Sequence, residues 1–307
     1  MKNGEFIFDT DGNVLHAHGG YIIKHGEYYY WYGEDRRDNF YVSCYRSRDL
    51  RRWEFRRHIL TTDSETRPYR VRTELKLRRG NGGKVNIERP KVLYCECTGK
   101  FVMWAHYENG RDYNDAAACI ATCDTPDGDF VYHGHFNPYG HMSRDCTLFR
   151  DADGTAYFIS ASRDNADLHV YRLTDDYMNV DKLVNILFQG EYREAPAVFY
   201  RSGKYYMLSS FCTGWNPNQG CWSASDSVDG KWSLLENFGD ETTFHSQPAF
   251  VLPVGDEFYY IGDRWGGYPM TRPFDYSKSG YVILKIRFDE DDAPYIEWSD
   301  EGEFPSL

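Results

Sequence analysis

The chain has 307 residues, and 41% of them are hydrophobic, which is enough apolar material for a sizeable core. Its formal net charge of −12 argues against a nucleic-acid partner, because nucleic-acid affinity depends on Lys and Arg contacts to phosphate. The sequence has no apolar run of about 18 residues, so it does not predict a membrane span.

The N-terminal sequence contains no apolar segment of the kind found in secretory signals. The 8 Cys are too sparse for a disulfide scaffold and lack the paired spacing of metal-binding motifs. We therefore expect reduced thiols and a cytoplasmic protein, or a secreted protein if a signal peptide has been removed.

Five stretches of the chain share one pattern, and each of them predicts a β-hairpin. Each stretch starts at a polar residue, continues as a short apolar run, turns at a Gly and resumes as an aromatic-rich run. The five leading polar residues are His18, Glu88, Asp145, Glu194 and Gln247. The corresponding turn glycines are Gly26, Gly99, Gly154, Gly203 and Gly255.

A third strand-like run follows each hairpin, so the repeat is longer than a hairpin alone. A hairpin with one or two further strands, recurring about every 50 residues, is typical of propeller blades. We therefore predict an all-β fold, a single five-bladed β-propeller over residues 1–307. A β-sandwich is the alternative, but the leading residues are never apolar, which favours a polar ring at one end of a channel. The third runs are 41–53, 118–130, 168–180, 220–232 and 281–298.

The interval between the first and second repeats is lengthened by an insertion at 61–87. It contains the one strongly basic stretch of the chain, residues 67–84. A short local cluster of cations usually marks a solvated surface, so we predict a solvated loop or hairpin here.

The ring of leading residues favours acid–base chemistry. Carboxyl groups held close together cannot all ionise easily, so repulsion and partial burial raise the pKa of at least one of them. That group can act as a general acid near neutral pH while another stays charged, the division of labour that glycoside hydrolysis uses. Four tryptophans behind the ring positions suit the faces of sugars or the core, and they are Trp31, Trp104, Trp215 and Trp265.

A metal site is the competing use of such a cluster, but only one leading residue is His and no HExxH-like spacing occurs. The DADG sequence at 151–154 lacks the remainder of a calcium loop and predicts a hairpin turn. The chain contains neither a GxSxG motif nor a Gly-rich phosphate loop before a helix. We expect no metal and no cofactor.

At these motifs the sequence resembles glycoside hydrolase family 43, and within it the exo-β-1,3-galactanase branch. The segments HAHGGYII, ERPKV, SRDCTLFRDADGTAYFISAS, EAPAVF and SQPAFV stand in the order of that branch and cover roughly residues 14–265. The resemblance implies an inverting enzyme that releases galactose from β-1,3-galactan or another galactose-containing glycan.

The resemblance also implies roles for single residues. Glu194 matches the general acid, and Asp145 matches the residue that orients this acid and tunes its pKa. Most of the family carries an Asp base on the first blade, where this chain has HAHGG instead, so the residue that activates water is either Gln247 or Glu88. The residues expected to bind the terminal galactose are His18, Glu34, Tyr113, Asn165, Thr213 and Trp215.

Two alternatives to this function remain open. The same fold could serve an arabinofuranosidase, a β-xylosidase or a galactofuranosidase, although those activities usually retain the first-blade Asp. The chain could also be a non-catalytic carbohydrate-binding propeller, which the presence of Glu194 disfavours.

Overall fold

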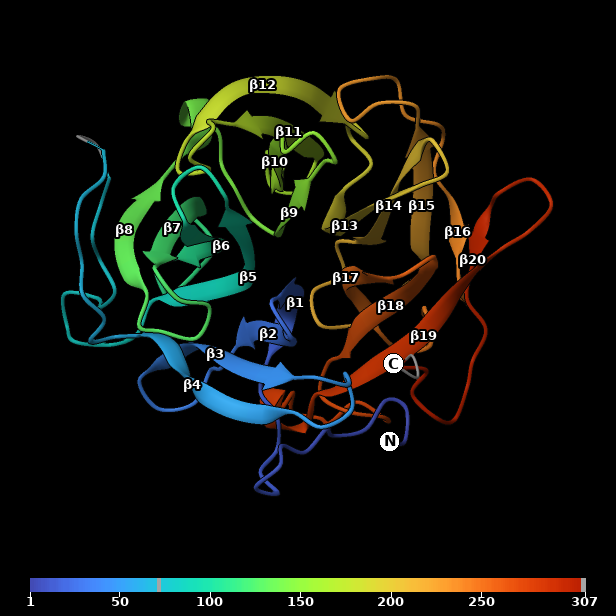
Figure 1. The fold of residues 1–307 in the computed structure, drawn as a ribbon, viewed down its shortest axis with the longest axis horizontal. Helices are drawn as coiled ribbons and strands as arrows, with labels where there is room; N and C mark the ends of the chain where they lie inside the picture. The colour runs from blue at the N-terminus through green and yellow to red at the C-terminus, as the bar shows by residue number, and fades with distance from the viewer. Residues whose placement is uncertain (71–72, 305–307) are drawn as a thin grey trace.

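The computed structural model describes residues 1–70 and 73–304 of the chain. It contains five four-stranded antiparallel sheets, arranged around a central axis as the blades of a β-propeller (Figure 1). The only helices in the described residues are the short η1 (Pro138–Gly140) and η2 (Tyr276–Lys278). Neither of these helices is long and apolar enough to cross a membrane.

Each blade takes its four strands from one continuous stretch of the chain, as the five repeats predict. Blade 1 consists of β1 (His18–His25), β2 (Tyr28–Glu34), β3 (Phe40–Ser47) and β4 (Glu54–Thr61). Blade 2 consists of β5 (Asn86–Cys95), β6 (Lys100–Glu108), β7 (Ala117–Cys123) and β8 (Val131–Phe136). Blade 3 consists of β9 (Cys146–Arg150), β10 (Ala156–Ser162), β11 (Asp167–Leu173) and β12 (Val180–Leu187). Blade 4 consists of β13 (Arg193–Arg201), β14 (Lys204–Phe211), β15 (Gly220–Ser225) and β16 (Glu236–Phe238). Blade 5 consists of β17 (Gln247–Val254), β18 (Glu257–Arg264), β19 (Gly280–Phe288) and β20 (Pro294–Tyr295).

The first strand of every blade lines the axis. These five strands contact one another in turn, from β1 through β5, β9, β13 and β17, and β17 contacts β1 again to close the ring (Figure 1). Five clusters of buried apolar side chains form the core, and each contains residues of two neighbouring blades. Burial of these faces between sheets is what holds the blades together.

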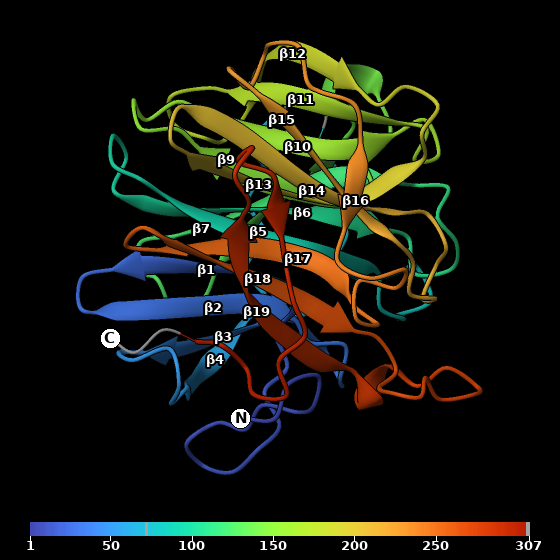
Figure 2. The same cartoon turned by 90° about the vertical axis from the view of Figure 1, so that its right-hand side faces the viewer.

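The N-terminal segment closes the ring at blade 5. The Asn3 side chain accepts a hydrogen bond from the Ile283 amide (2.8 Å) and donates to the Ser299 carbonyl (3.0 Å). The Gly4 amide donates to the Tyr281 carbonyl at 2.6 Å, and the Tyr281 amide donates to the Glu5 carbonyl. The start of the chain therefore lies along β19, close to the last described residues (Figures 1 and 2).

The insertion between blades 1 and 2 follows β8 on the outside of blade 2 (Figure 1). Isolated bridges join Thr66 to Tyr132 and Glu74 to His135, and a third joins Arg78 to Lys84. Apart from residues 71–72, which lie outside the described part of the chain, the basic stretch is mostly exposed or half-buried. The insertion is therefore a loop, and the bridge between Arg78 and Lys84 closes a short turn near its end.

Candidate active site

Residues of all five blades line one pocket of about 240 Å³ at the end of the axis. The four predicted catalytic residues, Glu88, Asp145, Glu194 and Gln247, are all in its lining. Four of the predicted sugar-binding residues are there too, namely Glu34, Tyr113, Asn165 and Trp215. The lining also contains Arg36, Arg89, His106, Arg144, Cys212, Gly214 and Trp265.

A β-bulge aims the leading side chains at this pocket. The pairing register shifts just after Glu88 in β5 and just after Glu194 in β13. The next residue in each strand, Arg89 or Ala195, has a φ of 53°. A positive φ strains a residue other than Gly, and bulges of this kind re-aim side chains beside active sites. A Pro follows in both strands, which the ladder tolerates because the inner edge of the first strand has no partner.

Arg89 connects its own blade 2 to three other blades at the pocket. Its guanidinium forms an ion pair with the Asp145 carboxylate of blade 3, with Nε 3.1 Å from Oδ2, and it donates to Gln247 Oε1 and the Pro248 carbonyl in blade 5. Its backbone amide donates to Glu34 Oε1 at 3.0 Å in blade 1. Burial opposes the charge, but the surrounding carboxylates, Asp145 foremost, raise the pKa of Arg89. The cation is therefore permanent, and it fixes the acids around it.

Glu194 has no cation within salt-bridge distance among the described residues. Its carboxylate accepts hydrogen bonds from Gln247 Nε2 (3.0 Å) and Asn165 Nδ2 (3.2 Å), both of which are neutral amides. Burial, and then the negative charge of Asp145, raises the pKa of Glu194 to about 8. Glu194 is therefore protonated at neutral pH and can donate a proton, as a general acid must.

The amide of Gln247 is held in one orientation. Its Oε1 accepts from Arg89 and from Trp265 Nε1 (2.8 Å). Its Nε2 donates to Glu194 and to Ser210 Oγ (2.9 Å). Both donors and the acceptor of the amide are thus satisfied, so the oxygen faces the cation and the nitrogen faces the acid.

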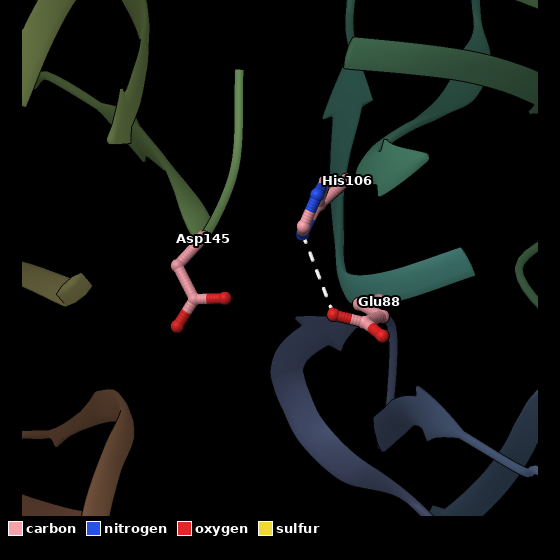
Figure 3. Close-up of side chains that lie close together, drawn as sticks. All are labelled: Glu88, His106 and Asp145. Carbon is pink, nitrogen blue, oxygen red and sulfur yellow. Dashed lines mark ion pairs between the residues drawn. The ribbon is translucent and has the colours of Figure 1, made fainter. Parts of the chain in front are cut away.

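Glu88 stands in the same position of its blade as Glu194, but in a cationic environment. Its Oε1 accepts from Arg36 (3.0 Å) and from the Tyr113 hydroxyl (3.1 Å), and its Oε2 lies 3.4 Å from His106 Nδ1 (Figure 3). Burial opposes its ionisation, but Arg36 and His106 lower the pKa of Glu88 to about 2. Glu88 is therefore a stable carboxylate.

Glu88, His106 and Asp145 offer ligand atoms within 4.8 Å of one another, a spacing that could suit a metal ion (Figure 3). Their chemistry does not fit one. Although burial opposes it, Glu108 and Glu88 raise the pKa of His106 to about 9 when no ion is bound, so the imidazole would have to lose a proton before it could bind a metal. Arg36 and Arg89 already compensate the two carboxylates.

Aromatic rings form one wall of the pocket. Trp215 lies edge-on to Trp265, with ring centroids 5.1 Å apart, and stacks on Phe274 at 4.6 Å. The other two candidate tryptophans, Trp31 and Trp104, are fully buried between blades and belong to the core. Trp215 and Trp265 each lie in a loop after the second strand of a blade, so of the four tryptophans only these two are placed to contact a sugar.

Two predicted sugar-binding residues lie outside the pocket lining. His18 is buried, with Nδ1 2.9 Å from the Asp263 carboxylate and its ring stacked on Tyr281. Thr213 is exposed, and its hydroxyl joins a loop by donating to the Asn216 carbonyl at 2.6 Å. His18 therefore supports the pocket from behind, and Thr213 shapes the loop that carries Trp215.

The repeat pattern did not predict the two cations beside Glu88. Glu88 forms its ion pair with Arg36, which lies two residues after the end of β2. His106 stands opposite Glu88 in the hairpin register. Counting outward from the turn at Gly99 would have placed Tyr107 opposite Glu88, because the bulge shifts the pairing by one residue. Leading residues of three other blades also pair with polar residues. These pairs are His18 with Glu34, Glu194 with Ser210 and Gln247 with Asp263.

Comparison with protein families gives a match to Glycosyl hydrolases family 43 over residues 16–250. No curated protein sequence matches the chain significantly.

Several solved structures are similar over nearly the whole chain. An exo-β-1,3-galactanase from Clostridium thermocellum is 44% identical with a TM-score of 0.88, over 98% of this chain and 65% of that protein. An exo-β-1,3-galactanase from Phanerochaete chrysosporium, solved with β-1,3-galactotriose, is 32% identical with a TM-score of 0.85, over 98% of this chain and 67% of the other. A β-1,3-galactosidase solved with galactodeoxynojirimycin is 32% identical with a TM-score of 0.84, over 99% and 100%. The chain thus spans about two thirds of the first two proteins and the full length of the third.

The environment of Glu194 yields a prediction about Asp145. Replacing Asp145 by Asn removes a negative charge that opposes ionisation of the acid, so the pKa of Glu194 should fall. Carbon-13 NMR of labelled Glu side chains can follow this titration. Asp153→Asn, in the exposed turn before β10, is the matched control and should leave the titration unchanged. An unchanged Glu194 titration in Asp145→Asn would show that burial alone sets its pKa.

Proposed function

Because the chain belongs to glycosyl hydrolases family 43, we propose that it removes galactose from the non-reducing ends of β-1,3-galactan chains with inversion of configuration. The observation that carries the proposal is Glu194, a carboxyl with a pKa of about 8 in a pocket that all five blades enclose. The similar proteins named as exo-β-1,3-galactanases and a β-1,3-galactosidase support the choice of sugar and linkage. A pocket with Arg89 across its floor suits a chain end better than a chain interior.

In this mechanism Glu194 protonates the glycosidic oxygen as its bond to the anomeric carbon breaks. The positive charge that develops on the sugar ring is stabilised by two carboxylates of the pocket, Asp145 and Glu88, which pair with Arg89 and Arg36. Loss of the proton leaves Glu194 negative beside Asp145, and the Asn165 amide then stabilises the new carboxylate.

We assign Gln247 to holding the water and Glu88 to binding sugar hydroxyls. The water adds to the anomeric carbon as the glycosidic bond breaks, and the resulting strongly acidic oxonium loses its proton to solvent. With a pKa of about 2, Glu88 is a weak base, and its ion pair with Arg36 suits a group that accepts hydrogen bonds from hydroxyls. The amide of Gln247 touches the acid in the sugar-free pocket, whereas the acid and the water's activator in inverting enzymes stand about 6.5–9.5 Å apart. The sugar must therefore break this hydrogen bond when it enters.

The substrate class is tested by incubating the protein with debranched β-1,3-galactan and, separately, with arabinan. We expect free galactose from the first and no sugar from the second, with products separated by chromatography. Release of arabinose alone would replace this function by an arabinofuranosidase, and no product from either polymer would favour a binding protein.

The role of the acid is tested by Glu194→Gln, which keeps the shape and removes the proton. Hydrolysis of galactan should slow by about 10²–10⁴-fold, because general acid catalysis contributes about that much. An aryl galactoside with an acidic phenol as leaving group needs little protonation, so its hydrolysis should slow much less. Equal losses on both substrates would mean that Glu194 binds sugar and does not donate the proton.

The assignment of the water is tested with azide, a small anion that can occupy the place of a missing water activator. We expect azide to restore turnover of the aryl galactoside in Gln247→Ala and to yield α-galactosyl azide, which NMR identifies. Glu88→Ala is the comparison variant. Rescue in Glu88→Ala alone would make Glu88 the base.

A further inference from the structure

A second and larger hollow lies beside the active-site pocket, on the outside of blade 2. It has a volume of about 1370 Å³, and we call it the basic hollow. Its walls are the insertion after blade 1 on one side and residues near the ends of β6, β7 and β8 on the other. Its cationic lining residues are Arg70, Lys76, Arg78, Arg79 and Arg111.

The basic hollow and the active-site pocket share a wall. In the loop after β6, Tyr113 lines the pocket and donates to Glu88, whereas the next residue, Asn114, lines the basic hollow. Before β9, Arg144 lines the pocket and Met142 lines the basic hollow. Arg144 also donates to the Tyr113 carbonyl at 3.1 Å and so ties the two segments together. A branched glycan whose end occupies the pocket therefore lies next to the basic hollow.

Three of the five cations have no ion-pair partner within the described ranges. Lys76 binds Glu74 and Arg78 binds Asp63, but no salt bridge involves Arg70, Arg79 or Arg111 in the part of the chain that the structure describes. The acids in the lining are Glu74 and Asp115, and Glu74 forms the ion pair with Lys76.

Two of these free cations are held in place without an acid. The Arg70 guanidinium lies 4.2 Å over the Phe136 ring. Arg79 reaches only a carbonyl, that of Gly110 at 3.4 Å, and its buried Nε has no hydrogen-bond partner among the described residues. Buried polar groups are normally satisfied, and an Arg fork matches a planar or tetrahedral anion.

The lining of the hollow also contains aromatic rings beside the charges, one of them the buried Tyr107. Tyr107 and His135 stack with centroids 3.5 Å apart. Burial lowers the pKa of His135 to about 4, so this ring is neutral at physiological pH and adds no charge. Neutral rings next to guanidinium groups are a combination that suits an acidic sugar, whose ring is flat-faced and whose substituent is anionic.

We propose that the basic hollow binds an acidic sugar, bearing a carboxylate or a sulfate, on a side branch of the polymer whose end enters the active-site pocket. Arg79 and Arg111 hold the anionic group by charge-assisted hydrogen bonds, with Arg70 on its Phe136 platform beside them. The proposal rests on the proposed galactanase function for the identity of the main chain. It makes the enzyme, despite its net charge of −12, selective for anionic branches.

The kinetic test compares three polymers with the full chain. They are debranched β-1,3-galactan, a β-1,3-galactan whose branches end in a uronic acid, and the second polymer after reduction of its carboxyl groups to alcohols. We expect kcat/KM to be about 10-fold higher on the acidic polymer than on its reduced form, since charged hydrogen bonds exceed neutral ones. Added salt should reduce this ratio.

The double variant Arg79→Gln/Arg111→Gln should bring the ratio close to one and leave activity on debranched galactan unchanged. Arg172→Gln, which removes a surface cation that pairs with Asp181 on blade 3, is the control and should keep the wild-type ratio. Arg111→Gln alone, at an exposed position, should lower the ratio even if the double variant folds poorly. A ratio of one in the wild type, or a ratio unchanged by these variants, overturns the proposal.

Direct binding separates this proposal from the galactanase function. NMR titration with methyl β-glucuronide, methyl galactoside 6-sulfate and neutral methyl β-glucoside should show shifts near Arg79 and Arg111 for an acidic sugar only. Preference for the glucuronide or for the sulfate identifies the source of the anion. Equal response to the neutral sugar, or no response to any, overturns the proposal. If debranched galactan is not cleaved, the galactanase function is wrong. This titration still decides whether the basic hollow binds an acidic sugar.

Discussion

The buried guanidinium of Arg89 is the interaction on which the rest of the site depends. Arg89 of blade 2 contacts Asp145 and Gln247 through its guanidinium and Glu34 through its backbone amide, so it joins four blades in one bonded unit. A cation in such a place needs carboxylates around it, and carboxylates crowded at one end of a propeller need a cation. The positive φ of Arg89 in the bulge strains the backbone. The bonds around the Arg89 side chain offset this strain.

Two glutamates in equivalent positions have opposite properties because of what surrounds them. Glu88 faces Arg36 and His106 and has a pKa of about 2, whereas Glu194 faces amides and a carboxylate and has a pKa of about 8. Arg89 pairs directly with Asp145 and not with Glu194, so its charge lowers the pKa of Glu194 less than burial and Asp145 raise it. One repeated strand start thus supplies a fixed charge in one blade and a proton donor in another.

Much of this arrangement follows from the sequence because the repeat is periodic. Equivalent positions in equivalent hairpins must meet at one end of the axis, so Glu88, Asp145, Glu194 and Gln247 could be placed together by alignment alone. Side chains that come from loops between strands obey no such rule, and Arg36 was missed for that reason. The burial of a tryptophan could not be predicted from the sequence either. Trp31 in a strand and Trp215 in a loop both follow a leading residue closely, yet Trp31 is in the core and Trp215 lines the pocket.

The closure of the ring by the N-terminal segment has a consequence for the order of folding. Asn3 and Gly4 bond to residues of β19 about 280 positions later in the chain, so their partners are synthesised much later than they are. At about 5–20 residues per second, this segment waits on the order of 15–60 s with its backbone groups unpaired. Blades 1 to 4 can each form from contiguous chain during that interval, since every hairpin is local. The last step is then a long-range closure, and until it occurs the facing apolar surfaces of blades 1 and 5 remain open to other chains.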